Sequence, residues 1–149
     1  MDRILDSACT GPLCLRIPEI AKMVMDAICY RDLRSFQLHA FAVMPNHVHL
    51  LMTPLEAVSR TMQSLKRLSA REGNRMLGLT GQPFWQDESY DRLVRNDLEF
   101  ERIVNYIERN PVTAGLVLTP EEFPWSSARP IANRLQVDNL PHTSVCQLP

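Results

Sequence analysis

The sequence of 149 residues lacks the features that mark several classes of protein. No apolar run approaches the roughly 20 residues that cross a bilayer, and the start, MDRILDSACTGP, has no cationic flank followed by a hydrophobic core. The four cysteines are widely spread and form no Cys-x-x-Cys pair, which is typical of reduced thiols. We therefore expect a cytoplasmic protein that is neither secreted nor embedded in a membrane.

The chain also lacks an excess of charge, internal repeats and a glycine-rich phosphate loop. Sixteen Lys and Arg residues face seventeen Asp and Glu residues, and the net charge is -1. No global basic field therefore indicates binding to nucleic acid, and any such evidence must be local. The length is that of one domain, so we expect a single domain over 1–149, with a core at about 18–130 and an irregular tail at 131–149.

The hydrophobic pattern that is present predicts an α+β protein. Two runs, SFQLHAFAVM and HVHLLMT, predict the strands of a hairpin that turns at Pro45-Asn46. Helical spacing of apolar residues predicts helices over 18–32, 57–77 and 97–110, the last ended by Pro111, with a short strand or turn at 92–95. In the segment after this helix, Phe123 and Trp125 are the expected anchors. This order suggests an antiparallel sheet with helices covering one face.

The predicted helix over 57–77 carries a concentrated cationic stripe. Its apolar residues share one face, and an arc of about 80° on the opposite side holds Arg60, Arg67, Arg71 and Arg75. In isolation, such a stripe is as consistent with a solvated helix face as with contacts to phosphates.

Two histidines one residue apart, His47 and His49, follow the predicted turn in the stretch VMPNHVHLLMTP. Residues i and i+2 of a strand project from the same face, so the two imidazoles can hold one metal ion together. Two ligands do not complete a metal site. By itself, this spacing is therefore more often that of two half-buried strand histidines.

A second element supplies the polar groups that the histidines lack. Tyr106 and Asn110 are four residues apart on the predicted helix over 97–110, and therefore lie on one face. Asn110 can offer an amide oxygen to a divalent ion, and Tyr106 can attack a phosphodiester that a metal polarises. Taken alone, a tyrosine at the edge of an apolar helix face is more often a packing residue.

These residues together resemble a known family. VMPNHVHLL, followed by FWQDESYDRLVRN, YIERNPVTAGLV and PEEFPWSSA, resembles the single-tyrosine transposases of the HUH type, in particular the REP-associated tyrosine transposases within the IS200-like family. The similarity runs from about residue 18 to 130. The joint occurrence of His-x-His and the tyrosine helix is far more specific than either part.

The resemblance implies a metal-dependent enzyme that cuts and rejoins single-stranded DNA near imperfect (REP-like) hairpins through a 5′-phosphotyrosine. It implies that Tyr106 is the nucleophile, that His47, His49 and Asn110 bind Mg²⁺ or Mn²⁺, and that the protein is a monomer or a homodimer. The arginine stripe then becomes the expected phosphate-contacting surface, joined by Lys66. Trp85, Tyr90 and Arg92 are candidates to stack on or clamp bases, although Trp85 is at least as well explained as a core residue.

Two departures from the family matter. The family fold is ferredoxin-like and opens with a strand in the middle of the sheet, whereas this sequence begins in what corresponds to the segment after that strand. We expect the central strand to be missing, which leaves an unpaired edge and impairs activity. Tyr90 also lies where relatives carry a tyrosine, so the choice of Tyr106 rests on its place in the helix.

Two alternative functions remain open at this point. The first is a catalytically impaired homologue that only binds hairpin DNA. The second is a metal-dependent phosphohydrolase that uses water as its nucleophile and forms no protein–DNA adduct.

Overall fold

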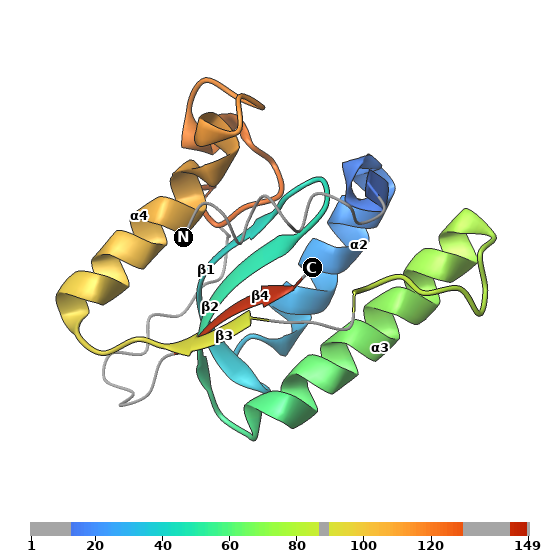
Figure 1. Cartoon of the computed structure of the whole chain (residues 1–149), viewed down its shortest axis with the longest axis horizontal. Coiled ribbons are helices and arrows are strands. Elements are labelled where there is room, and N and C mark those ends of the chain that lie inside the picture. The colour runs from blue at the N-terminus through green and yellow to red at the C-terminus, as the bar shows by residue number, and fades with distance from the viewer. Residues whose placement is uncertain (1–12, 87–89, 130–143, 149) are drawn as a thin grey trace.

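The computed structural model describes residues 13–86, 90–129 and 144–148, in which helices pack on a four-stranded antiparallel sheet (Figure 1). The elements in chain order are η2 (Leu13–Arg16), α2 (Pro18–Arg31), β1 (Phe36–Val43), β2 (Val48–Pro54), α3 (Val58–Leu77), β3 (Tyr90–Leu93), α4 (Asp97–Thr113), η3 (Pro120–Glu122) and β4 (Ser144–Leu148). The α+β class and the predicted hairpin are confirmed. No helix in the described ranges is long and apolar enough to cross a bilayer.

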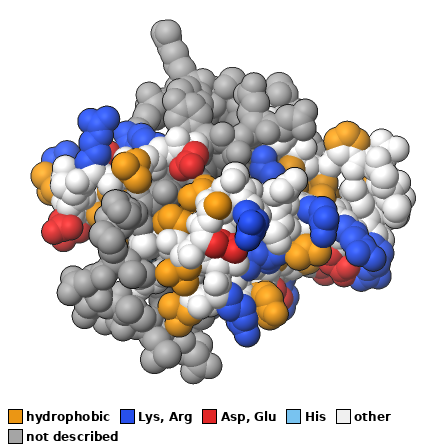
Figure 2. Space-filling view, turned by 90° about the horizontal axis from the view of Figure 1, so that it is seen from below, with side chains coloured by type: hydrophobic (Ala, Val, Ile, Leu, Met, Phe, Trp, Pro, Cys, Tyr) orange, Lys and Arg blue, Asp and Glu red, His pale blue; other side chains and the backbone are white. Residues whose placement is uncertain are grey.

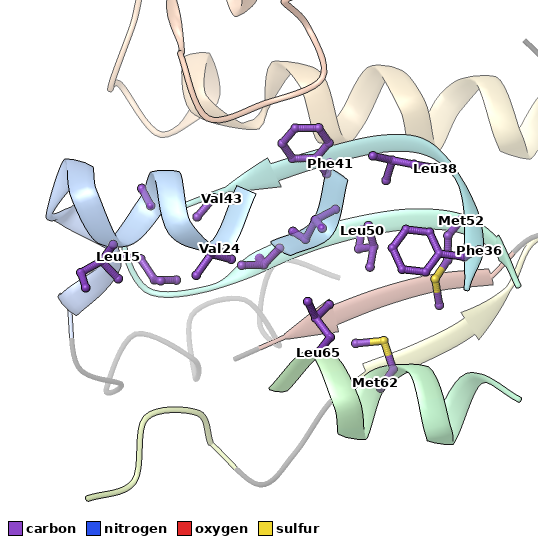
Figure 3. Close-up of a cluster of buried hydrophobic side chains, with 14 of the residues drawn as sticks. Leu15, Val24, Phe36, Leu38, Phe41, Val43, Leu50, Met52, Met62 and Leu65 are labelled. Carbon is purple, nitrogen blue, oxygen red and sulfur yellow. The ribbon is translucent and has the colours of Figure 1, made fainter. Parts of the chain in front are cut away.

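The helices cover both faces of the sheet, so the prediction that they cover one face is wrong. On one face α2 and α3 bury Phe41, Leu50 and Met52 (Figure 3). On the other face α4 places the fully buried Ile107 in a cluster with Ala42 and Leu51. The strands show the physical reason. Nearly every position of β1 and β2 is buried, rather than alternate positions, as in a sheet that is covered on both sides.

A bulge in β1 changes which of its side chains point to each face of the sheet. The register with β2 shifts between Leu38 and Ala40, where His39 is the extra residue. Beyond the bulge Phe41 and Val43 face α2 and α3, while the small residues Ala40 and Ala42 face α4. Small side chains on that face allow α4 to lie close to the strand that pairs with the histidine strand.

The place beside β2 is filled by β4, which overturns the expected unpaired edge. The sheet order is β1-β2-β4-β3, and β4 runs antiparallel to both of its neighbours. In Figure 1 this strand, drawn in red, lies between β2 and β3. The expectation of an irregular tail at 131–149 is wrong for Ser144–Leu148, which form an interior strand. Since pairing across the sheet joins residues far apart in the sequence, local patterns did not reveal it.

Helix α4 continues past the proline that was expected to end it. It runs to Thr113 with Pro111 inside. A proline in the last turn removes only one intrahelical hydrogen bond, and the following bonds are kept, since the Ala114 N–H still donates to the Asn110 carbonyl at 2.9 Å. The buried Pro111 ring packs within the fold instead of breaking the helix.

The loop after α3 is held against that helix by hydrogen bonds of polar side chains. Trp85 Nε1 donates to Ser69 Oγ at 2.9 Å, and Asn74 Nδ2 donates to the Gln82 carbonyl at 2.6 Å. Between these bonds the Phe84 ring lies against Gly73, where a Cβ would approach the ring to 2.4 Å. Trp85 is thus a half-buried packing residue on the α2–α3 side of the sheet.

The contact between Gly73 and Phe84 generates the first prediction. Gly73→Ala is expected to lower the free energy of unfolding, because overpacking against a buried ring costs about 1–3 kcal/mol and exceeds the gain of about 1 kcal/mol from alanine in a helix. Urea denaturation measures the change. Combining it with Phe84→Leu should give a loss smaller than the sum of the single losses. A stabilised Gly73→Ala protein would contradict the close approach.

The interior position of β4 generates the second prediction. Val145 pairs with Leu51 of β2 and with Arg92 of β3. Val145→Pro is expected to reduce stability by at least about 1–3 kcal/mol, because proline donates no ladder hydrogen bond, leaves the partner carbonyl unpaired and is not tolerated in central strands. Val145→Ile, which keeps the donor, is the matched control and should unfold like the wild type. Equal stability of the two variants in urea denaturation would exclude an interior β4.

Candidate active site

The hairpin turn places the two histidines next to each other. The Met44 N–H donates to the His47 carbonyl at 2.8 Å across the Pro45-Asn46 turn, and His49 lies in β2 opposite Ala42. His47 Nε2 lies 3.0 Å from His49 Nε2, and both imidazoles are buried. The predicted convergence of the two rings is therefore observed.

The protonation of His47 is set by the residue before it. Asn46 Oδ1, an acceptor, lies 2.7 Å from His47 Nδ1, which donates its proton there. In the neutral ring the Nε2 lone pair is then left pointing toward His49. An outer partner of this kind fixes the tautomer of a metal-binding histidine. From the sequence Asn46 was expected only as a turn residue, and its place directly before His47 is the signal that could have indicated this second role.

The electrostatics keep both rings neutral. Burial lowers the pKa of His47 to about 4. Burial, together with the nearby charge of a protonated His47, lowers the pKa of His49 to about 3. Neutral imidazole is the form that binds metal ions, so the pair is available as a ligand at and well below neutral pH.

The two nitrogen atoms fit a divalent ion as adjacent ligands. Ligands about 2.0–2.1 Å from one ion are about 3 Å apart when they meet at a right angle, and the observed Nε2–Nε2 distance is 3.0 Å. Among the described residues no group of three His, Cys, Asp or Glu side chains could hold an ion. Any third protein ligand from this part of the chain would therefore be of another type, such as the amide expected at Asn110.

Helix α4 brings the predicted tyrosine to the histidines. Its start is fixed by Asn96, whose Oδ1 accepts the Glu99 N–H at 2.9 Å. Tyr106 lies edge to face with His49, with ring centroids 5.7 Å apart, and is 40% exposed. Asn110 follows one helical turn later and is half-buried. The phenol is therefore a solvent-accessible group beside a buried pair of imidazoles.

The predicted DNA-binding residues are not gathered at this site. Arg60, Arg67, Arg71 and Arg75 are exposed on α3, across the sheet from α4. In the view from below, Lys and Arg side chains are spread over the molecule, with one group at the right and another at the left (Figure 2). Arg75 forms an ion pair with Glu72 at 2.6 Å. A shallow hollow nearby is lined by Leu68, Arg71, Glu72, Arg75 and Thr80.

The two remaining cationic candidates have partners within the protein. Lys66 Nζ donates to the Gln86 carbonyl at 3.2 Å and helps to hold the loop after α3. Arg92 forms an ion pair with Glu99 at 2.8 Å, which joins β3 to the first turn of α4. Tyr90, the other candidate tyrosine, is the first residue of β3.

Comparison with known proteins gives one curated relative and one solved structure of similar fold. A REP-associated tyrosine transposase of Escherichia coli (strain K12) is 29% identical over 94 residues, which make up 63% of this chain and 55% of the relative. The chain thus spans about half the length of this curated relative. The structure of a REP-associated tyrosine transposase bound to a REP hairpin is similar in fold, with a TM-score of 0.60 and 22% identity over 87% of this chain and 82% of that chain.

The family assignment rests on a match to most of the chain. The family described as "Transposase IS200 like" matches residues 17–110, a stretch that contains both histidines and runs from the start of α2 to Asn110. The resemblance in the sequence analysis is thereby confirmed. The protein belongs to the IS200-like transposase family.

Proposed function

We propose that the protein cuts and rejoins single-stranded DNA beside hairpins, using Tyr106 as the nucleophile and a Mg²⁺ or Mn²⁺ ion held by His47, His49 and Asn110. The observation that carries this proposal is the contact of Tyr106 with His49, whose Nε2 lies 3.0 Å from that of His47. A nucleophile and a pair of neutral metal ligands from two distant elements meet at one point. Membership of the transposase family supports the same chemistry.

In the proposed cleavage step the phenol oxygen of Tyr106 attacks the phosphorus of a DNA phosphodiester and loses its proton to solvent. The bond from phosphorus to the 3′ oxygen breaks, this oxygen takes up a proton, and the 5′ phosphate stays bound to the tyrosine. A bound cation supplies positive charge to the phosphate oxygens, which makes the phosphorus easier to attack. Tyr106 is 40% exposed, which leaves room for a flexible strand to reach it.

Rejoining is the reverse step, with a 3′ hydroxyl as the attacking group. The phosphotyrosine bond is a phosphodiester, as is the DNA bond that it replaces, so one bond is exchanged for another of the same kind. The exchange consumes no nucleotide, in keeping with a sequence that has no glycine-rich phosphate loop.

The hairpin is proposed as the partner because the structurally similar transposase is bound to a REP hairpin. Within this proposal the exposed arginines of α3 contact phosphates of a part of the DNA that lies away from the cut, since the sheet separates them from Tyr106. Lys66, Arg75 and Arg92 contribute less in this scheme, because their charged groups are already bonded within the protein. Such contacts set affinity and orientation rather than sequence preference.

The assignment of the nucleophile generates the third prediction. Tyr106→Phe is expected to abolish the covalent protein–DNA adduct, because phenylalanine has no oxygen to attack phosphorus. The measurement is a denaturing gel with labelled single-stranded hairpin DNA and Mn²⁺. Tyr30→Phe is the matched control, because Tyr30 is an exposed tyrosine of α2 that stacks with Arg34. Its adduct should equal that of the wild type.

The same gel separates the alternatives. An adduct on the Tyr106→Phe protein would refute the assignment. Cleavage by the wild type without any adduct would instead show a phosphohydrolase that uses water. Hairpin binding without cleavage would show a binding protein.

The lowered pKa values of the histidines generate the fourth prediction. A pair with the ordinary pKa of 6.5 would lose about 100-fold in metal affinity between pH 7.5 and 5.5, because protons compete at both rings. With pKa values of about 4 and about 3, both rings stay neutral over this range, so Mn²⁺ affinity should change less than about threefold. Calorimetric titration at the two pH values measures it. His49→Ala should bind weakly at both, and a 100-fold loss in the wild type would contradict the buried neutral pair.

A further inference from the structure

The segment after α4 returns to the sheet and bonds to the free edge of β1. The Val43 N–H donates to the Trp125 carbonyl at 2.8 Å, and the Ser127 N–H donates to the Phe41 carbonyl at 2.9 Å. Between them Ser126 forms an isolated antiparallel bridge with Ala42. Ala42 in turn pairs with His49. The returning segment is therefore fixed in the same row of the sheet as the metal-binding histidine.

Ser127 joins this segment to two other elements through one hydroxyl group. Its Oγ accepts the Phe41 N–H at 3.0 Å and lies 2.8 Å from Glu108 Oε1. The Phe41 carbonyl is further away, at 3.3 Å. A hydroxyl has one proton to donate, and the shorter bond to a carboxylate is the stronger one. Ser127 thus bridges the backbone of β1 and a side chain of α4.

Glu108 is placed to control the roll of α4 about its axis. Successive residues of an α-helix are about 100° apart, so Tyr106 and Glu108 project to opposite sides of Ile107, which is fully buried against the sheet. On one side Tyr106 meets His49, and on the other side Glu108 meets Ser127. A roll of the helix that lengthened either contact would move the other.

We infer that the hydrogen bond between Ser127 and Glu108 is a positioning contact, which sets the roll of α4 and thereby holds the Tyr106 ring beside His49. The Ser127 hydroxyl is hydrogen-bonded to Phe41 and Glu108 rather than to the histidines or Tyr106, so we expect it to act through the helix. The effect on catalysis rests on the proposed function, whereas the effect on the Tyr106–His49 contact does not. Misplacing a reacting group by about 1 Å can cost about 100-fold in rate, so even a small roll should be measurable.

The test compares variants that delete the hydrogen bond between Ser127 and Glu108 with one that conserves it and one that changes a neighbouring residue. Ser127→Ala and Glu108→Ala delete the bond from its two ends, whereas Glu108→Gln keeps an acceptor oxygen. Ser126→Ala is the matched control, because it removes a neighbouring buried hydroxyl that is bonded to the Phe123 carbonyl rather than to α4.

The first readout needs no catalysis. In the DNA-free protein, nuclear Overhauser contacts between the Tyr106 and His49 rings should weaken in Ser127→Ala and Glu108→Ala and persist in Ser126→Ala and Glu108→Gln. Persistence of the wild-type contacts in both alanine variants of the bonded pair would overturn the inference. If Ser127→Ala does not fold, Glu108→Ala decides the question, because it leaves the sheet contacts of Ser127 in place.

The second readout is the single-turnover rate of adduct formation with hairpin DNA and Mn²⁺. We expect about a tenfold loss in each alanine variant of the bonded pair, near wild-type rates in Glu108→Gln and Ser126→Ala, and affinities for Mn²⁺ and DNA within about twofold of the wild type. The double variant should be no slower than the single ones. A wild type without adduct would refute the proposed function, and the ring contacts would still test the positioning of α4.

Discussion

The constraint on which the rest of the structure depends is the burial of the β1–β2 hairpin on both faces. Residues Val48 to Thr53 are all buried, because α2 and α3 cover one side and α4 the other. This burial removes water from the two imidazoles and keeps them uncharged. It also requires α4 to lie against the strand pair, which brings Tyr106 to His49. The same packing therefore stabilises the fold and brings the side chains of the candidate site together.

Short-range patterns in the sequence were sufficient for much of the fold and for the chemical groups of the site. The hairpin around Pro45-Asn46 and the helices at 18–31 and 58–77 follow from turn chemistry and from apolar spacing within one segment. The pairing of His47 with His49 follows from the two-residue period of a strand. Predicting that Tyr106 lies beside His49 required a further assumption, taken from the family resemblance, that the two segments share a site.

What the sequence did not reveal depends on contacts between distant segments. The position of β4 and the layer that each helix occupies are decided by pairing and packing across the whole fold. Pro111 stays within its helix because its ring is buried there, which a local rule does not include. Likewise the sequence shows that Arg92 carries a charge, and only the fold shows its ion pair with Glu99 at 2.8 Å. A residue type indicates what a side chain can do, and only the fold shows which neighbour it meets.

The return of residues 125–127 to β1 also bears on self-association. An exposed edge strand offers unpaired N–H and carbonyl groups to which another molecule can add a strand, and this is a common route to aggregation. Here the Phe41 carbonyl and the N–H groups of Phe41 and Val43 are already bonded to that segment. The end of β1 nearest the histidines is therefore closed to strand addition. The segment that carries Ser127 therefore also protects this edge against edge-to-edge pairing with another molecule.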